Sequence, residues 1–249
     1  MKSFNWLLVL SVLSCIGCSS PVHEDGRGCA FVSDSIQYRV EFMSAGCVRI
    51  LSFPEGDTLV TKRLVVDSQK PAFKDYKWKD TGQQLIFSTR ELSVAFDKED
   101  AAFTFQEVST GKLLLKEKEA KKARHFKRSV TGGEQCLEVT QRFVPTDDEA
   151  IYGLGQYQNG IMNYRGKSVL LLQANMDIVN PFLISTNGYG ILWDNYSSTK
   201  FEDTKEGYSF TSEVGDASDY YFVYGKNMDE VVAGYRELTG DVPMFGKWV

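Results

Sequence analysis

Histidine is scarce in this sequence: His23 and His125 are the only two among 249 residues. A metal site built from several histidines is excluded, and we expect no metal site and no cofactor. The sequence also lacks a phosphate-binding P-loop, a G-x-S-x-G sequence and an HExxH sequence. Its 28 basic residues are outnumbered by 33 acidic ones and form no basic stripe, so nucleic acid is not an expected partner.

Long apolar runs are also missing, and the run at residues 6–13 is too short for a membrane span, which takes about 20 apolar residues. Lys2 precedes this run, and Gly17-Cys18 follows it, an arrangement that resembles a bacterial lipoprotein processing site. We therefore expect residues 1–17 to be a lipoprotein signal peptide and Cys18 to be the lipidated residue.

The expected mature chain begins with a tether at residues 18–30, which is polar and contains glycine and proline. A lipid on Cys18 would anchor the protein to a membrane of the bacterial cell envelope, on the outer membrane's periplasmic or surface face. Two alternatives stay open: an ordinary secretory leader, and processing at Cys15. Downstream of Cys18, the cysteines at positions 29, 47 and 136 allow at most one disulfide, or three buried free thiols.

Most of the remaining chain predicts strands, because apolar and polar residues alternate in short segments separated by turn residues. The segment from Ile36 to Phe42 shows this period of two clearly. The other expected strands are 47–53, 85–87, 92–96, 103–105, 113–115, 137–143, 169–173, 182–185, 191–193 and 220–224. This pattern predicts an all-β fold, a large antiparallel β-sandwich over residues 31–226.

Helical signals are few. Val231, Val232, Tyr235 and Leu238 recur at helical spacing, with Asn227 or Asp229 as the N-cap and Thr239-Gly240 as the end. The basic stretch 116–128 has no apolar stripe, and we expect a long exposed turn or a strand edge there.

Residues 151–195 are dense in Gly, Asn, Gln, Tyr and Trp, which are residue types that contact sugar hydroxyls and stack on sugar rings. This region resembles the N-terminal region of glycoside hydrolase family 31, a family of retaining α-glucosidases and α-xylosidases. The matching pieces are Tyr152-Gly153-Leu154-Gly155-Gln156, Asn163-Tyr164-Arg165-Gly166, Gln173-Ala174-Asn175-Met176-Asp177, Pro181-Phe182-Leu183-Ile184-Ser185 and Gly188-Tyr189-Gly190-Ile191-Leu192-Trp193-Asp194-Asn195.

The resemblance implies a galactose-mutarotase-like supersandwich, followed in the family by a (β/α)8 barrel that carries both catalytic aspartates. We expect residues 227–249 to be the linker helix and the start of that barrel, which is itself absent from this chain. No residue here is assigned a catalytic role.

By the same resemblance, Asp177 matches a loop acidic residue that hydrogen-bonds a substrate hydroxyl, and Asn175 shares its loop face. Gln156 and Asn163 are expected to hold the loop. Trp193 is expected in the core, with stacking on a sugar as the alternative, and Arg165 is expected on the surface or paired with an acid. Asp194-Asn195 is expected to form a turn.

The expected function is therefore that of the carbohydrate-contacting domain of a retaining α-glycosidase that acts on α-xylosidic or α-glucosidic bonds in oligosaccharides. The chain alone would be inactive, with the barrel as its missing partner. The alternative is a free-standing carbohydrate-binding lipoprotein. A sugar mutarotase is disfavoured because His125 is the one histidine outside the tether, and it lies in a basic stretch. A purely structural interaction domain is the remaining interpretation.

Overall fold

The computed structural model describes residues 22–57, 64–66, 71–119 and 124–248. The expected signal peptide and Cys18 lie outside this part of the chain. Within it, no helix is long and apolar enough to cross a membrane. Cys29, Cys47 and Cys136 are free thiols, so no disulfide joins the three cysteines of the expected mature domain.

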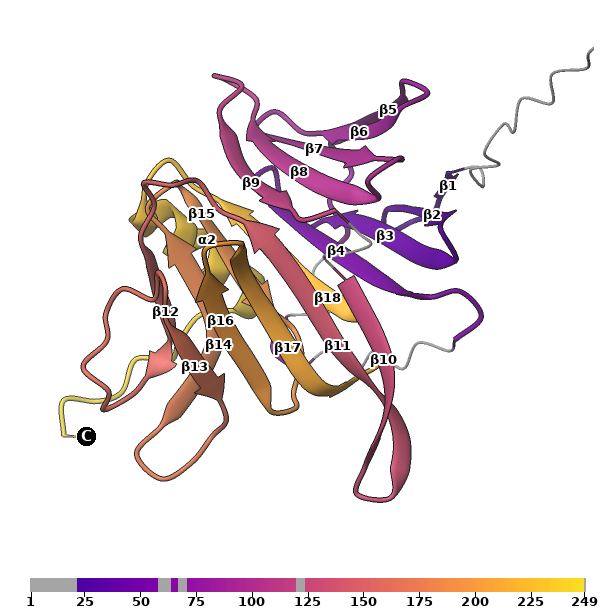
Figure 1. Cartoon of the computed structure of the whole chain (residues 1–249). Helices are drawn as coiled ribbons and strands as arrows, with labels where there is room; N and C mark the ends of the chain where they lie inside the picture. Colours follow the sequence, from indigo (N-terminus) through magenta and orange to yellow (C-terminus); the bar gives the residue numbers. More distant parts are fainter. Residues whose placement is uncertain (1–21, 58–63, 67–70, 120–123, 249) are drawn as a thin grey trace, which may run out of the picture.

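Two antiparallel sheets pack face to face, which confirms the predicted sandwich (Figure 1). The first sheet has eight strands, in the spatial order β1 (His23–Glu24), β2 (Cys29–Ser33), β3 (Ile36–Phe42), β4 (Cys47–Pro54), β18 (Ser218–Tyr224), β15 (Tyr189–Trp193), β14 (Ile178–Ser185) and β12 (Ile151–Gln156). The second sheet has the order β13 (Ser168–Leu171), β16 (Thr199–Thr204), β17 (Gly207–Gly215), β11 (Glu134–Val144), β9 (Leu113–Glu117), β8 (Ala102–Glu107), β7 (Leu92–Asp97), β6 (Gln84–Ser88) and β5 (Lys77–Asp80), with β10 (Arg124–Thr131) paired to β11.

The period of two seen in the sequence places one side of each strand in the interior. In β3, Tyr38 and Val40 are fully buried between the sheets, whereas Arg39 and Glu41 form an ion pair on the other face. The sheet begins earlier than the predicted boundary at residue 31. β1 lies within the expected tether and pairs with β2, with His23 opposite Ala30, because this stretch can add main-chain hydrogen bonds to an existing edge.

Both ends of the basic stretch 116–128 form strands, and residues 120–123 lie outside the described part of the chain. β9 continues to Glu117, and β10 begins at Arg124 and pairs with β11 over its whole length. The strand-edge prediction is therefore confirmed for residues 124–128. β10 forms because it pairs with the long strand β11. The local pattern of charges in the sequence does not indicate such a partner strand.

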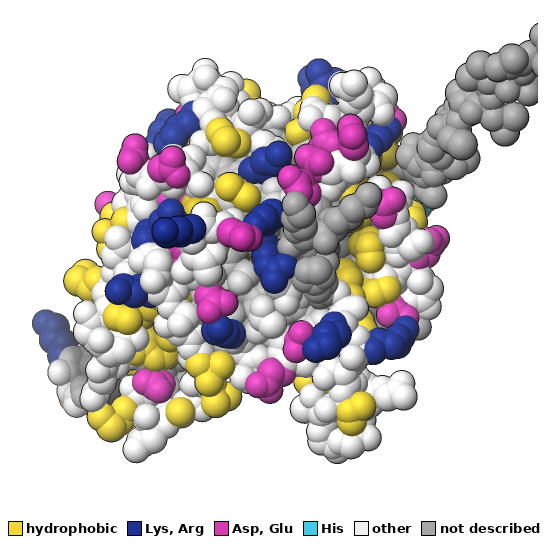
Figure 2. Space-filling model, viewed as in Figure 1, with side chains coloured by type: hydrophobic (Ala, Val, Ile, Leu, Met, Phe, Trp, Pro, Cys, Tyr) yellow, Lys and Arg dark blue, Asp and Glu magenta, His cyan; other side chains and the backbone are white. Residues whose placement is uncertain are grey.

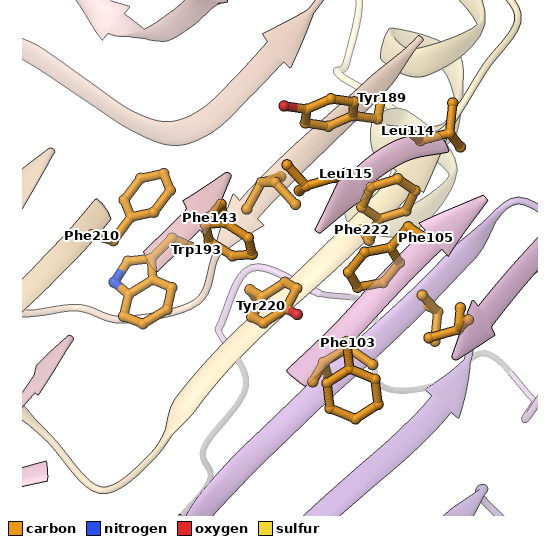
Figure 3. Packing of buried hydrophobic residues seen from close by; sticks show 14 of the residues in the cluster. Phe103, Phe105, Leu114, Leu115, Phe143, Tyr189, Trp193, Phe210, Tyr220 and Phe222 are labelled. Carbon is orange, nitrogen blue, oxygen red and sulfur yellow. The ribbon is translucent and has the colours of Figure 1, made fainter. Parts of the chain in front are cut away.

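Aromatic rings from the two sheets meet in the interior (Figure 3). Phe105 of β8 stacks on Phe222 of β18 with ring centroids 4.2 Å apart. Phe143 of β11 meets Tyr220 of β18 edge-on at 5.1 Å. Each such pair is worth about 0.5–1.5 kcal/mol beyond the apolar area it buries, so these contacts fix how the sheets face each other.

Helix α2 (Met228–Thr239) covers the outer face of the first sheet and confirms the predicted helix. Asn227 is the N-cap, and its Oδ1 accepts the Glu230 N–H at 2.9 Å. Gly240 ends the helix with a φ of 94°. Tyr235 stacks on Phe182 of β14 at 4.2 Å, so the helix is packed directly behind the strand that leads out of residues 174–177.

Strand β12 is irregular, and its glycines explain why the sequence pattern did not predict a strand there. Gly153 and Gly155 have positive φ values of 99° and 118°, and the pairing register with β14 shifts between them. A Cβ atom at Gly155 would lie 2.1 Å from the Ile178 carbonyl oxygen. Only glycine allows this close approach of two strands.

Glu149, two residues before β12, carries a buried carboxylate. Glu149 is 5% exposed, and it accepts hydrogen bonds from Ser185 Oγ at 2.7 Å and Tyr189 Oη at 3.0 Å. Burial raises the pKa of Glu149, and the two hydroxyl donors offset only part of that rise. The group therefore binds its proton more tightly in the folded protein than in the unfolded chain.

We expect Gly155→Ala to lower the free energy of unfolding by about 3 kcal/mol, since it combines a strained φ with a clash against main chain. Gly160→Ala is the matched control: its φ is also positive, at 68°, but nothing lies within 4 Å of the added atom. The control is expected to lose about 1 kcal/mol. Urea denaturation followed by circular dichroism measures both, and equal losses would contradict the account of the bulge.

Because the folded-state pKa of Glu149 is raised above the usual 4.5, its contribution to stability is present at low pH and is lost as pH rises through the raised value. Glu149→Gln should therefore gain stability relative to the wild type between about pH 4 and pH 8. Urea midpoints measured across this range test the prediction. Glu134→Gln, at an exposed position, is the control and should show no such trend. A constant difference for Glu149→Gln, or one that favours the wild type at high pH, would refute it.

Candidate functional site

Residues 174–177 form a tight turn that leads into β14. The Ala174 N–H donates to the Asp177 carbonyl at 3.4 Å, and the Asp177 N–H donates to the Ala174 carbonyl at 3.3 Å. Asn175 and Met176 occupy the tip, and Met176 has a φ of 70°. A left-handed conformation strains any residue other than glycine by about 1 kcal/mol or more, and such strain concentrates at functional sites.

The base of this turn is held by a side chain and by the β-ladder. Gln173 Oε1 accepts the Val179 N–H at 3.1 Å, closing the turn from the side. Ile178 then pairs with Gln156 at the end of β12. Gln156 thus holds this region through its main chain, as predicted, while its side chain is exposed. The 174–177 turn is therefore ordered, because it is anchored to the paired strands β12 and β14.

The two residues predicted to contact a substrate lie together on this turn. Asn175 is exposed and Asp177 is half-buried. Within the described residues, neither the Asp177 carboxylate nor the Asn175 side-chain amide makes a hydrogen bond. A carboxylate offers about four acceptor positions and an amide offers two donors, so both can bind the hydroxyls of a sugar.

The charge of Asp177 acts on the Tyr157 hydroxyl, a coupling that the sequence did not indicate. Burial, with smaller contributions from Tyr164 and from the negative charge of Asp177, raises the pKa of Tyr157 to about 12. The Tyr157 hydroxyl stays protonated and donates to the Leu154 carbonyl at 3.0 Å. Tyr157 therefore adds a half-buried aromatic ring to this end of the sandwich, and aromatic rings are common in sugar sites.

The chain that follows Tyr157 is held by buried partners. Asp203, 6% exposed, accepts the Gly166 N–H at 2.7 Å and pairs with Arg165 at 3.2 Å. This is the acidic partner anticipated for Arg165, although its location in β16 was not predicted. Asn163 Oδ1 accepts the N–H groups of Ile151 and Arg165 at 3.1 and 3.0 Å, which confirms its predicted structural role.

The remaining residues singled out in the sequence are structural. Trp193 is fully buried, as predicted, and its Nε1 donates to Ser212 Oγ at 2.9 Å. Asn195 forms the expected turn, since its Oδ1 accepts the Ser197 N–H at 2.8 Å. In the part of the chain that the structure describes, no three His, Cys, Asp or Glu side chains lie close enough together to hold a metal ion.

Exposed apolar side chains gather at this end of the molecule. Figure 2 shows hydrophobic atoms clustered at the lower left, where β13 and β14 lie in Figure 1. The large apolar residues exposed on the turn, on β13 and on the adjoining chain are Met162, Leu170, Leu172, Met176 and Ile178. The segment after α2 adds Val242, Met244, Phe245 and Trp248, which are 71–97% exposed. Extended apolar patches of this kind mark sites of interaction.

Several characterised proteins are similar to this chain. An alpha-xylosidase of Saccharolobus solfataricus is 34% identical over 229 residues, which cover 86% of this chain and 30% of that protein. Alpha-glucosidase 2 of Bacillus thermoamyloliquefaciens is 26% identical and is matched over 88% of this chain and 28% of its own length. The chain thus spans about a third of the length of these relatives.

Solved structures agree on the fold. The crystal structure of a family 31 alpha-xylosidase from Xanthomonas citri superposes with a TM-score of 0.81 at 22% identity, covering 91% of this chain and 41% of that one. The structure of a family 31 alpha-xylosidase from a soil metagenome, complexed with xylose, superposes with a TM-score of 0.78 at 22% identity, covering 91% of this chain and 36% of that one.

The family model that describes the glycosyl hydrolase 31 N-terminal galactose mutarotase-like domain matches residues 37–202. That range contains most strands of both sheets and the 174–177 turn, whereas β1, β2, β17 and β18 lie outside it. The chain therefore belongs to glycosyl hydrolase family 31, as its N-terminal galactose mutarotase-like domain.

Proposed function

We propose that this chain is the carbohydrate-contacting domain of a retaining α-glycosidase that cleaves α-xylosidic or α-glucosidic bonds in oligosaccharides. The observation that carries the proposal is the 174–177 turn, which is strained at Met176 and presents the side chains of Asn175 and Asp177 together. The names of the relatives, two of which are an alpha-xylosidase and an alpha-glucosidase, support this substrate class.

In this proposal the turn binds and orients a sugar, and the bond is broken elsewhere. Ionised Asp177 accepts a hydrogen bond from a substrate hydroxyl, a charge-assisted bond worth about 1.5–3 kcal/mol. Asn175 adds an amide that can both donate and accept. Retaining hydrolysis needs two carboxyl groups about 5–5.5 Å apart, which we assign to a (β/α)8 barrel outside this chain. This chain alone would then hydrolyse no glycoside.

The exposed apolar side chains favour a barrel as the partner. Inter-domain contacts within one polypeptide commonly bury about 600–1,500 Å2. The apolar residues of the turn, of β13 and of the segment after α2 would lie against the barrel and bring the 174–177 turn to the rim of its active site. This arrangement explains why the patch and the candidate sugar contacts occur at the same end of the sandwich.

We further propose that Cys18 carries a lipid that anchors the protein in the bacterial cell envelope. The proposal rests on the short apolar run and the Gly17-Cys18 sequence. Two acyl chains or more give stable membrane attachment, whereas a single chain binds reversibly. The enzyme would then meet its oligosaccharides at the outer membrane, on the periplasmic or surface face.

We expect Asp177→Ala to lower kcat/KM about tenfold to a hundredfold, which corresponds to the loss of one charge-assisted hydrogen bond. The assay is hydrolysis of α-xylosides and α-glucosides by the source organism's polypeptide that carries this domain together with a barrel. Glu134→Ala, at an exposed position in the β10–β11 hairpin, is the matched control and should leave kcat/KM unchanged. Unaltered kinetics for Asp177→Ala, or hydrolysis by the 249-residue chain alone, would refute the proposal.

We expect Cys18→Ser to release the protein from the membrane fraction and to abolish incorporation of radiolabelled palmitate. Cys15→Ser is the control, and it should leave both unchanged. The intact mass of protein extracted from native membranes provides an independent check, because a lipidated Cys18 adds the mass of its acyl chains. A secreted, unlipidated product would favour the ordinary secretory leader instead.

A further inference from the structure

A cavity of about 330 Å3 opens at the end of the sandwich, between the chain that enters and leaves the 174–177 turn and the segment that follows β15. Leu172, Val179 and Pro181 line one side. Gln173 and Ser198 contribute polar groups, and Tyr196 contributes an aromatic ring. A cavity of this size is at the small end of the range for ligand sites, which is about 300–1,000 Å3.

The Tyr196 ring is held in place by its hydroxyl. The hydroxyl accepts the Leu64 N–H at 2.8 Å and donates to the Asp194 carboxylate. Burial raises the pKa of Tyr196 to about 12, so the hydroxyl remains protonated at neutral pH. The residue is nevertheless 54% exposed, and it contacts no other aromatic ring of the described residues. An aromatic surface is thus kept open and fixed in orientation.

The wall that carries Tyr196 is rigid. Asn195 Nδ2 donates to the Val214 carbonyl at 2.9 Å, and Ser197 Oγ donates to the same carbonyl at 2.7 Å. Ser198 Oγ donates to Glu213 at 3.3 Å. Among the other lining residues, Gln173 has its Oε1 fixed by the Val179 N–H, which orients the rest of its amide. A site already shaped in this way needs little ordering when a ligand binds.

We propose that this cavity is a second carbohydrate site, which binds one neutral pyranose unit and is distinct from the 174–177 turn. A pyranose has an apolar C–H face and a rim of hydroxyls, and the cavity has an aromatic and aliphatic surface beside polar groups. Its C–H face would stack on Tyr196, and its hydroxyls would bond to the Gln173 amide. The carboxylate of Asp194 at the wall disfavours an anionic ligand. The choice of a sugar as the ligand class rests on the proposed function.

The test is a titration of the isotope-labelled full chain with methyl α-D-xyloside and methyl α-D-glucoside, followed by two-dimensional NMR. We expect the amide signals of residues 194–198 to shift in a saturable way. Tyr196→Ala should weaken this binding about tenfold or more, because it removes the stacking surface. Tyr196→Phe is the matched variant: it keeps the stacking ring but loses the hydroxyl bonds that orient it, so its affinity should fall between those of the wild type and Tyr196→Ala.

Two further variants keep the proposal falsifiable. Leu172→Arg, at an exposed position, should block the cavity mouth and abolish the shifts even if Tyr196→Ala does not fold. Asp177→Ala should leave the affinity unchanged, which separates this site from the proposed substrate contact. The proposal is overturned if neither sugar shifts the amide signals of residues 194–198, or if Asp177→Ala abolishes these shifts while the cavity residues are intact. It is also overturned if the proposed longer polypeptide with its barrel binds no sugar in this cavity.

Discussion

The contact between the inner faces of two sheets is the constraint on which the rest of this structure depends. The sheets contribute interlocking rings, among them the stacked pair Phe105–Phe222 and the stacked pair Trp193–Phe210. A side chain that leaves this interface would open a void in a close-packed interior. Buried polar groups are also fixed in position at this interface, in their case by hydrogen bonds. The Glu117 carboxylate lies between the sheets and is bonded by the Tyr220 hydroxyl at 2.8 Å and the Gln141 amide at 2.9 Å.

The candidate site is located where this regular packing ends. Strand β12 comes too close to β14 for any side chain at Gly155, and the pairing register shifts there. The chain that leaves β12 is then free of the ladder and is held by Asp203 and Asn163. It passes Tyr157 and returns through β13 to the 174–177 turn. The polar and aromatic side chains at this end are therefore ordered by the sandwich but remain outside its core.

Alternation was enough to predict the strands in which one face is fully buried. Residues 36–42 and 92–96 became β3 and β7 because Tyr38, Val94 and their neighbours are apolar on one face only. Strands β16 and β17 were missed. They carry threonines and serines, and their inward residues include Thr199 and Ser212, which bond to each other. The inward polar groups of such strands form hydrogen bonds with the neighbouring strand. No local sequence pattern identifies that neighbouring strand.

The site was predictable in part. The resemblance to family 31 identified the segment with Asn175 and Asp177, and the structure places both on one turn. The electrostatic coupling of Tyr157 to Asp177 and the ion pair of Arg165 with Asp203 depend on segments that are distant in the sequence. Periodicity and motifs describe neighbours along the chain, so these tertiary partners could only be found in the folded protein.

The measurement that tests the central claim most directly is a crystal structure of the proposed longer polypeptide, in which this domain is joined to a barrel, with a bound α-linked xylo- or gluco-oligosaccharide. The account predicts that the 174–177 turn lies at the barrel's active site, with an Asp177 oxygen about 2.5–3.0 Å from a sugar hydroxyl. A turn that faces solvent away from the sugar, or a barrel packed against another face of the sandwich, would contradict it.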